Sequence, residues 1–224
     1  MSLAAYWAYF TQDGVRYLTA SGNEHRHIVD LHFAGGLGGF DWDVEGMGQV
    51  GYIDSKDIRA WYFGAIGGYT FKNVAWSPRL GLQFDIASGN SDRTGGTLGT
   101  FNPLFPNGYY FALAGYTGFP NIVHLKPSLT VHPTAATKLM LAVAPQWRQT
   151  TADAVYTQPN VPVPGTAGQP GSYTGTYFQL RFDWQLTRQL SFGVEAVHFA
   201  VGDVIRRAGG RDADYVGVQL AFGW

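Results

Sequence analysis

The feature that most constrains the fold is the alternation of side chains in the final stretch, Asp214 to Trp224 (DYVGVQLAFGW). Large apolar side chains occupy its even positions, which are Val216, Val218, Leu220, Phe222 and Trp224. Because successive side chains of a strand point to opposite faces, the stretch is predicted to form a strand with one hydrocarbon face and one wettable face. In water such a strand would be an adhesive edge, whereas a transmembrane barrel turns the apolar face to lipid and the terminal aromatic to the interface. A core strand that happens to come last is the alternative.

The same alternation recurs along the chain. Between residues 40 and 52, Asp41, Asp43 and Glu45 fall on one parity and apolar side chains on the other. Further segments of this kind cover 25–35, 78–89, 121–133, 138–149, 176–186 and 190–201, and 3–11 and 58–71 are rich in aromatics. This gives about ten strands of about 10–14 residues, which exceeds the roughly 5–6 residues of strands in soluble sheets. We therefore predict an all-β fold, an antiparallel transmembrane β-barrel that forms a single domain over residues 1–224.

The predicted connections alternate between short turns and long loops, the asymmetry expected of outer-membrane barrels. The Pro- and Gly-rich segment 157–172 is predicted to be a mobile loop that forms no strand. Residues 203–213 are predicted to form a charged loop. No helical period of meaningful length is expected anywhere.

Composition supports a membrane barrel and excludes several other classes. Apolar residues make up 46% and charged residues only 14%, while the mean hydropathy of −0.08 is near neutral because lipid-facing and lumen-facing side chains average out. No apolar run is long enough for a transmembrane helix. The net charge of −1 gives no reason to expect a nucleic-acid partner, and the absence of cysteine excludes disulfides and thiolate metal sites. The start MSLAAYWAYF has neither a basic leader nor a cleavage site, and we interpret the chain as the C-terminal part of a longer barrel that also has N-terminal strands.

Charged side chains on the non-lipid parity are the candidates for lining a solute path. The cations are Arg26, Arg79, Lys126, Arg148 and Arg181, and the anions include Asp30, Asp43, Glu45, Asp85, Asp183 and Glu195. Guanidinium groups suit the carboxylates of an anionic solute that must bind weakly and move on. The alternative is that these charges pair across neighbouring strands and stiffen the wall.

One loop carries a more specific signal. The strand end FDIASGN (84–90) is followed by GTFNPLFPNGYY (99–110), with the motif residues Phe101, Asn102, Pro103, Leu104, Phe105 and Pro106. This pairing, together with the runs at 60–71 and 78–89, resembles the alginate-export family of outer-membrane porins over about two-thirds of the chain. Members of that family have eighteen strands in the type case, so the chain resembles a C-terminal portion.

The resemblance implies passive export of an anionic polysaccharide through an arginine-lined constriction in the outer membrane of a Gram-negative bacterium. It also implies that the motif loop is folded at the extracellular side or into the lumen. The residues Val218, Leu220, Phe222 and Trp224 resemble the C-terminal signal that the barrel-assembly machinery recognises. The expected partners are therefore outer-membrane lipid, that machinery and the polysaccharide.

Enzymatic function is not expected. The chain contains no G-x-S-x-G, H-E-x-x-H, Walker or dinucleotide-binding motif, and we predict no catalytic residue, cofactor or metal. Two alternatives to the exporter stay open: a porin without polysaccharide specificity, and a soluble carbohydrate-binding β protein with aromatic stacking platforms.

Overall fold

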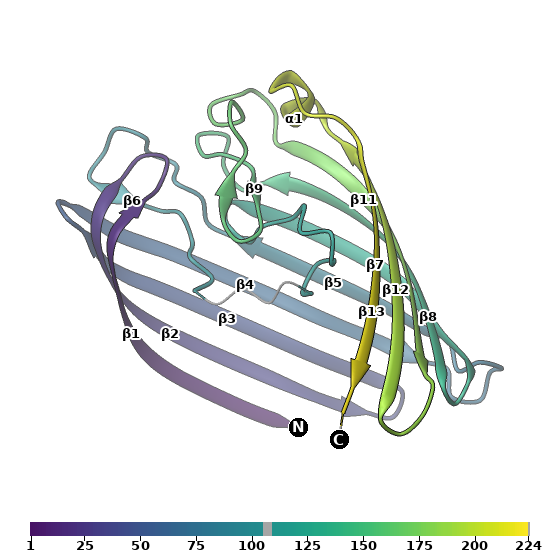
Figure 1. Ribbon diagram of the computed structural model, residues 1–224. Helices are drawn as coiled ribbons and strands as arrows, with labels where there is room; N and C mark the ends of the chain where they lie inside the picture. The colour runs from purple at the N-terminus through teal and green to yellow at the C-terminus, as the bar shows by residue number, and fades with distance from the viewer. Residues whose placement is uncertain (105–108, 224) are drawn as a thin grey trace.

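The computed structural model describes residues 1–104 and 109–223 and shows one large, curved, antiparallel sheet (Figure 1). Its strands pair with their neighbours in chain order, and short strand β6 (Thr97–Leu98) adds to β4 in parallel. The ten long strands are β1 (Ser2–Arg16), β2 (Ser21–Leu37), β3 (Phe40–Ile53), β4 (Lys56–Thr70), β5 (Arg79–Ala87), β7 (Ile122–Thr134), β8 (Thr137–Arg148), β11 (Tyr173–Gln185), β12 (Leu190–Val201) and β13 (Ala213–Phe222). The predicted all-β, antiparallel barrel-type sheet of about ten strands is confirmed. Among the described residues, the path of paired strands ends at β1 on one side and at β13 on the other.

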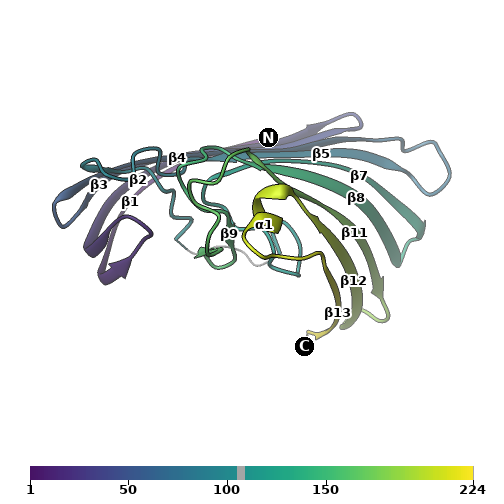
Figure 2. The same cartoon turned by 90° about the horizontal axis from the view of Figure 1, so that it is seen from above.

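The two faces of the sheet differ as the alternation predicts. The convex face is apolar and exposed, with Leu80 at 56%, Leu220 at 68% and Val216 at 71% exposure. The side chains next to these residues in the sequence, such as those of Arg79 and Gln219, point the other way and lie on the concave face. Viewed from above, the sheet is an arc with the long loops on its inner side (Figure 2). The chain therefore presents hydrocarbon outward over the length of its strands, as a membrane barrel wall does.

The connections are sorted between the two ends of the sheet. At one end lie short turns, such as the two-residue Gly38–Gly39 turn between β2 and β3, where Gly38 has a φ of +66° that glycine adopts without strain. The long connections 88–121, 149–172 and 202–212 all lie at the other end. Long loops on one side only are typical of outer-membrane barrels, whose extracellular loops are the long ones.

The long loops fold inward and form the hydrophobic core against the concave face. One cluster packs Phe101, Phe111 and Phe119 of the first loop against Tyr62 of β4. A second cluster packs Val155 of the next loop with residues of β11 and β12. The sheet therefore has no dry core of its own: its apolar face points outward, and the buried volume lies between the loops and the polar face.

Two predictions about the loops are wrong. Segment 157–172 does contribute to strands, because β9 (Tyr156–Thr157) pairs with β10 (Val161–Pro162). Segment 203–213 begins with a short helix, α1 (Asp203–Arg207), although no helix was expected there. Both elements are local responses to burial: Tyr156, Val204 and Ile205 are buried in contacts that a hydropathy pattern does not reveal.

In the part of the chain that the structure describes, no helix has the length and apolar character needed to cross a membrane.

Candidate functional site

The concave face carries all eleven charged residues that the sequence proposes for a solute path, and they fall into a buried group and a partly exposed group. Six are buried, five of them beneath the loops (Arg26, Asp85, Lys126, Arg148 and Glu195) and the sixth, Asp30, on β2. The other five, Arg79, Arg181, Asp43, Glu45 and Asp183, lie toward the short-turn end and stay at least partly exposed. Shared parity thus places a residue on the right face, but only the loops decide whether a solute can reach it.

Arg26 holds the start of the first loop. Its guanidinium contacts the Glu24 carboxylate, donates to Gln49 Oε1 at 2.7 Å and approaches the Thr100 carbonyl at 3.4 Å. Gln49 in turn donates to the carbonyl of Asn102 at 2.6 Å and accepts from its backbone N–H at 3.1 Å. A charged group that is fully buried needs this many partners, so Arg26 serves to anchor the motif loop.

The middle of the same loop is held by a buried carboxylate. Asp85 accepts hydrogen bonds from the hydroxyls of Tyr62 at 2.9 Å and Tyr110 at 2.6 Å, and its other oxygen lies 2.9 Å from His124 Nδ1. The second ring nitrogen of His124 lies 2.9 Å from the Tyr177 hydroxyl. Burial raises the pKa of the Tyr110 phenol well above its usual value, so the hydroxyl remains a donor.

Two further buried charges bind the backbone of the loop. Lys126 Nζ donates to the Phe111 carbonyl at 2.7 Å, and Glu195 accepts from the backbone N–H of Leu113 at 2.6 Å. Gln179 donates to the second oxygen of Glu195 at 2.8 Å. Hydrogen bonds to charged groups are about twice as strong as neutral ones, so this pair fixes residues 111–113 against the wall.

Arg148 anchors the second loop in a different way. Among the described residues, its guanidinium donates to backbone carbonyls alone, those of Thr151, Asp153, Thr166, Gln169 and Gly171. All five belong to loop 149–172, which closes around the side chain. Within the described residues Arg148 makes no ion pair.

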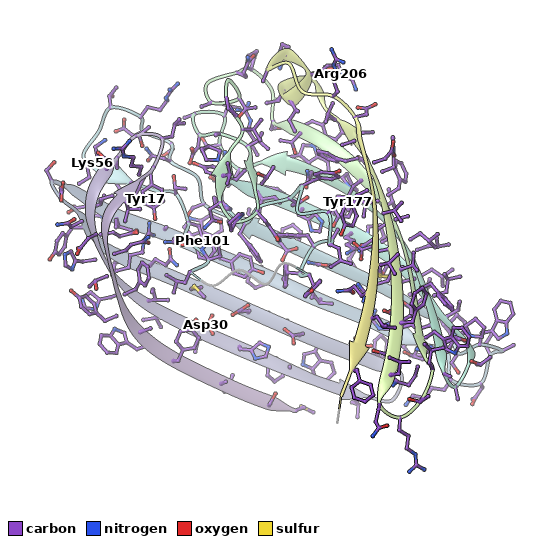
Figure 3. All side chains as sticks on the ribbon, viewed as in Figure 1. Tyr17, Asp30, Lys56, Phe101, Tyr177 and Arg206 are labelled. Atoms are coloured by element: carbon purple, nitrogen blue, oxygen red, sulfur yellow. The ribbon has the colours of Figure 1, made fainter. Side chains whose placement is uncertain are left out.

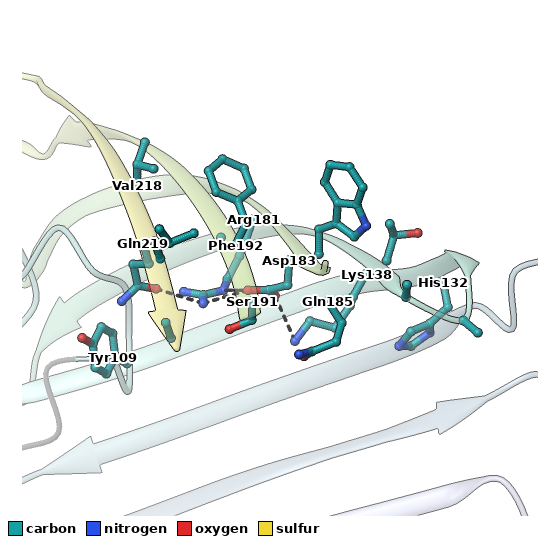
Figure 4. Close-up of a pocket in the computed structure, with 17 residues that line it drawn as sticks. Tyr109, His132, Lys138, Arg181, Asp183, Gln185, Ser191, Phe192, Val218 and Gln219 are labelled. Atoms are coloured by element: carbon teal, nitrogen blue, oxygen red, sulfur yellow. Dashed lines mark hydrogen bonds and ion pairs between the residues drawn. The ribbon is translucent and has the colours of Figure 1, made fainter. Parts of the chain in front are cut away.

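The open part of the concave face holds a groove of about 710 Å³ toward the short-turn end of β8, β11, β12 and β13 (Figure 4). Arg181 donates to Asp183 at 2.9 Å and to Gln219 at 3.1 Å, and it lies 3.4 Å from Glu195. Lys138 reaches Asp183 at 3.0 Å while 47% of its side chain stays exposed. The polar lining includes His132, Gln185 and Ser191. Sequence reasoning missed Lys138, although its parity with Arg148 on the same strand could have identified it.

An acidic surface lies on the same concave face but near the other edge of the sheet, on β2 and β3. Asp43, 54% exposed, lies 2.9 Å from His32, and Asp30 and Glu45 share the same face. Between the two sides, Arg79 pairs with Asp41 at 2.8 Å. The predicted pairing of charges between neighbouring strands is thus observed for several of these residues, and the role of the set in solute passage stays a prediction. The concave wall between the groove and the acidic surface is lined mostly by small residues, among them Gly64, Gly68, Gly81, Ser128 and Ala142.

The motif residues lie against this face where they are described. Phe101 is buried and stacks on Tyr62 with ring centroids 5.4 Å apart. Asn102 is bound by Gln49 as given above, while Pro103 and the partly exposed Leu104 continue the chain. Phe105 and Pro106 lie outside the described residues. On the last strand, Val218, Leu220 and Phe222 are exposed on the convex face, and Trp224 also lies outside the described residues.

Comparisons with known proteins place the chain. The family model described as alginate export matches residues 1–219. No curated protein matches the chain. Among solved structures, the chain is similar to one described as the NanC porin in a rhombohedral crystal form, with 8% identity, 99% of this chain and 98% of that chain covered, and a TM-score of 0.49. A likeness at that level says nothing about what this chain transports. Because the family model spans nearly all of the sequence, the chain belongs to the alginate export family, and this membership supports a transport channel of the outer-membrane porin or exporter type.

Proposed function

We propose that this protein lets an anionic polysaccharide of the alginate type pass by diffusion through the outer membrane of a Gram-negative bacterium. The observation that carries the proposal is the groove at Arg181 and Lys138, where two cations keep exposed surface while bound to one carboxylate, Asp183. A lysine or arginine that is already paired binds a uronate carboxylate weakly and releases it readily, as conduction requires. The family membership supports the same solute class.

We also propose that the curved sheet is one wall of a larger ring. Eight strands enclose an interior just wide enough for side chains, and sixteen to eighteen leave an aqueous channel. Loops 88–121 and 149–172 pack against the concave side and therefore take up space inside the arc. Further strands that pair with β1 and β13 would leave room for both loops and a path. Lipid is then expected on the convex face, and the assembly machinery on the last strand.

Single-channel recording in planar bilayers tests the solute. A polyuronate added to the bath is expected to interrupt the current, and a neutral glucan of the same length is not. Lys138→Gln should weaken the block by about two- to fivefold, the range expected for one solvent-exposed ion pair. Lys72→Gln is the matched control, since Lys72 is exposed in the turn 71–78 after β4 and outside the groove. Equal block by both polymers, or equal effects of the two substitutions, would contradict the proposal.

A porin without polysaccharide specificity is the second candidate, and the acidic surface on β2 and β3 favours it. Asp43 and Glu45, which keep exposed surface there, would repel a polyanion over part of the same face. This candidate predicts conduction of small ions with little block by any polymer. The soluble carbohydrate-binding alternative does not fit the convex face, where large apolar side chains are exposed along every long strand except β12.

A further inference from the structure

A second hollow lies on the concave side at the long-loop end, away from the groove of Arg181. It has a volume of about 240 Å³ and is formed by three separate parts of the chain: the end of β1 with the turn after it, the motif loop, and the β9–β10 hairpin. Two of its residues, Tyr17 and Phe101, are labelled in Figure 3. Sites for drug-sized molecules occupy roughly 300–1,000 Å³, so this hollow suits a single ring rather than a chain segment.

Its walls combine apolar rings with amides. The rings are those of Phe10, Tyr17, Phe101, Tyr156, Pro159 and Pro162. Aromatic rings bind the C–H faces of a sugar, and side-chain amides bind its hydroxyls. Burial raises the pKa of Tyr17 to about 12, so at neutral pH this wall adds no negative charge.

Two residues of the hollow adopt a backbone conformation that side chains rarely take. Leu104 has a φ of +60° and Asn160 a φ of +85°. Such residues cost energy and gather at binding sites, where the surrounding structure holds them in place. The side-chain oxygen of Asn160 is also buried with no hydrogen-bond partner in the described part of the chain. A buried acceptor without a donor is costly, and a hydroxyl of a bound molecule would satisfy it.

The rim carries one cation. Arg16, at the end of β1, is exposed, and within residues 1–104 and 109–223 its guanidinium makes no ion pair. A carboxylate on a ring bound in the hollow would find its counter-charge there. Gln12 lies on the same rim and adds a further amide.

From these four features we propose that the hollow is a binding subsite for one uronic-acid unit of a polysaccharide at the loop end of the channel. The ring would stack against the aromatic wall, a hydroxyl would donate to Asn160 Oδ1, and the carboxylate would face Arg16. This subsite rests on the proposed function for its ligand class, but it lies apart from the groove of Arg181. It gives the polymer a contact at the loop end of the channel.

The test measures binding of a tetrauronate to the full chain in lipid nanodiscs by isothermal titration calorimetry, with the carboxyl-reduced tetrasaccharide as the neutral probe. Arg16→Gln should weaken binding of the tetrauronate by about two- to fivefold and leave the neutral probe unchanged. Asn160→Gly keeps the left-handed backbone and removes the amide, and it should weaken binding of both probes by about fivefold. Arg188→Gln and Asn73→Gly are the matched controls, since both residues are exposed in turns at the opposite end of the sheet.

The outcomes separate the subsite from the proposed function. If the two pocket variants bind both probes as the controls do, the subsite is wrong, and block of the current by polyuronate still decides the function. If neither probe binds the unmutated chain, the subsite is also wrong. If Asn160→Gly weakens both probes but Arg16→Gln changes neither, the proposed contact between Arg16 and the carboxylate is overturned.

Discussion

Replacing Lys126 by methionine should release the first loop from the wall. The Lys126 ammonium is buried and donates to the Phe111 carbonyl at 2.7 Å, while the Tyr177 hydroxyl is more distant from that carbonyl, at 3.4 Å. Methionine matches the length of the side chain but donates no hydrogen bond. A buried hydrogen bond from a charged donor contributes about 1.5–3 kcal/mol. Since each 1.4 kcal/mol is a tenfold change, opening of the anchored segment should become about 10- to 100-fold more frequent.

Hydrogen–deuterium exchange of the peptide that contains Leu113 measures this opening directly. The Leu113 amide is bound to Glu195 at 2.6 Å and is protected only while the segment stays closed. Lys72→Met is the matched control: Lys72 Nζ also donates to a backbone carbonyl, that of Gly38 at 2.6 Å, but the bond is exposed. Its loss should change exchange by less than about fivefold. If Lys126→Met exchanges at this peptide no faster than Lys72→Met, the view that buried charges hold the loop is refuted.

Three further changes test the anchors, the faces and the register. Arg148→Lys leaves most of the carbonyls that Arg148 binds in loop 149–172 without a donor, at a cost of about 1–3 kcal/mol per unsatisfied buried group. Limited proteolysis should therefore cut this loop at least tenfold faster, and unchanged cleavage would contradict the role of Arg148 as an anchor. Leu220→Lys puts a charge on the lipid-facing side and should lower folding into vesicles by up to about 2–4 kcal/mol, whereas Gln219→Lys on the other face should not, and equal losses in a urea titration would reverse the assignment of the faces. Gly51→Ala brings a Cβ within 1.9 Å of the His25 carbonyl and should lower the yield of heat-resistant folded protein on gels; a normal yield would contradict this close approach.

For the candidate site, the sequence could predict which face of the sheet each charged residue occupies, but not whether a solute can reach it. Parity assigned Arg26, Lys126 and Arg148 to the concave side together with Arg181, and the structure places all four there. Parity could not separate the three that anchor loops from the one that lines the open groove. That distinction rests on the backbone groups that each charge reaches, which are Thr100 for Arg26 and the carbonyls of the following loop, 149–172, for Arg148.

The sequence alone determined the strands and their two faces, because side-chain direction in a strand repeats every two residues and is fixed by local stereochemistry. It also determined the family, through the motif at 99–110. Tertiary structure decided that the long loops turn inward, that Tyr156–Pro162 forms a hairpin and that half of the charged face is closed off. The inward fold of the loops depends on which backbone groups the buried charges reach, and some of these are far away in the chain, as Leu113 is from Glu195. No local pattern encodes such a pairing, since burial of a charge becomes favourable only when the distant partner is already in place.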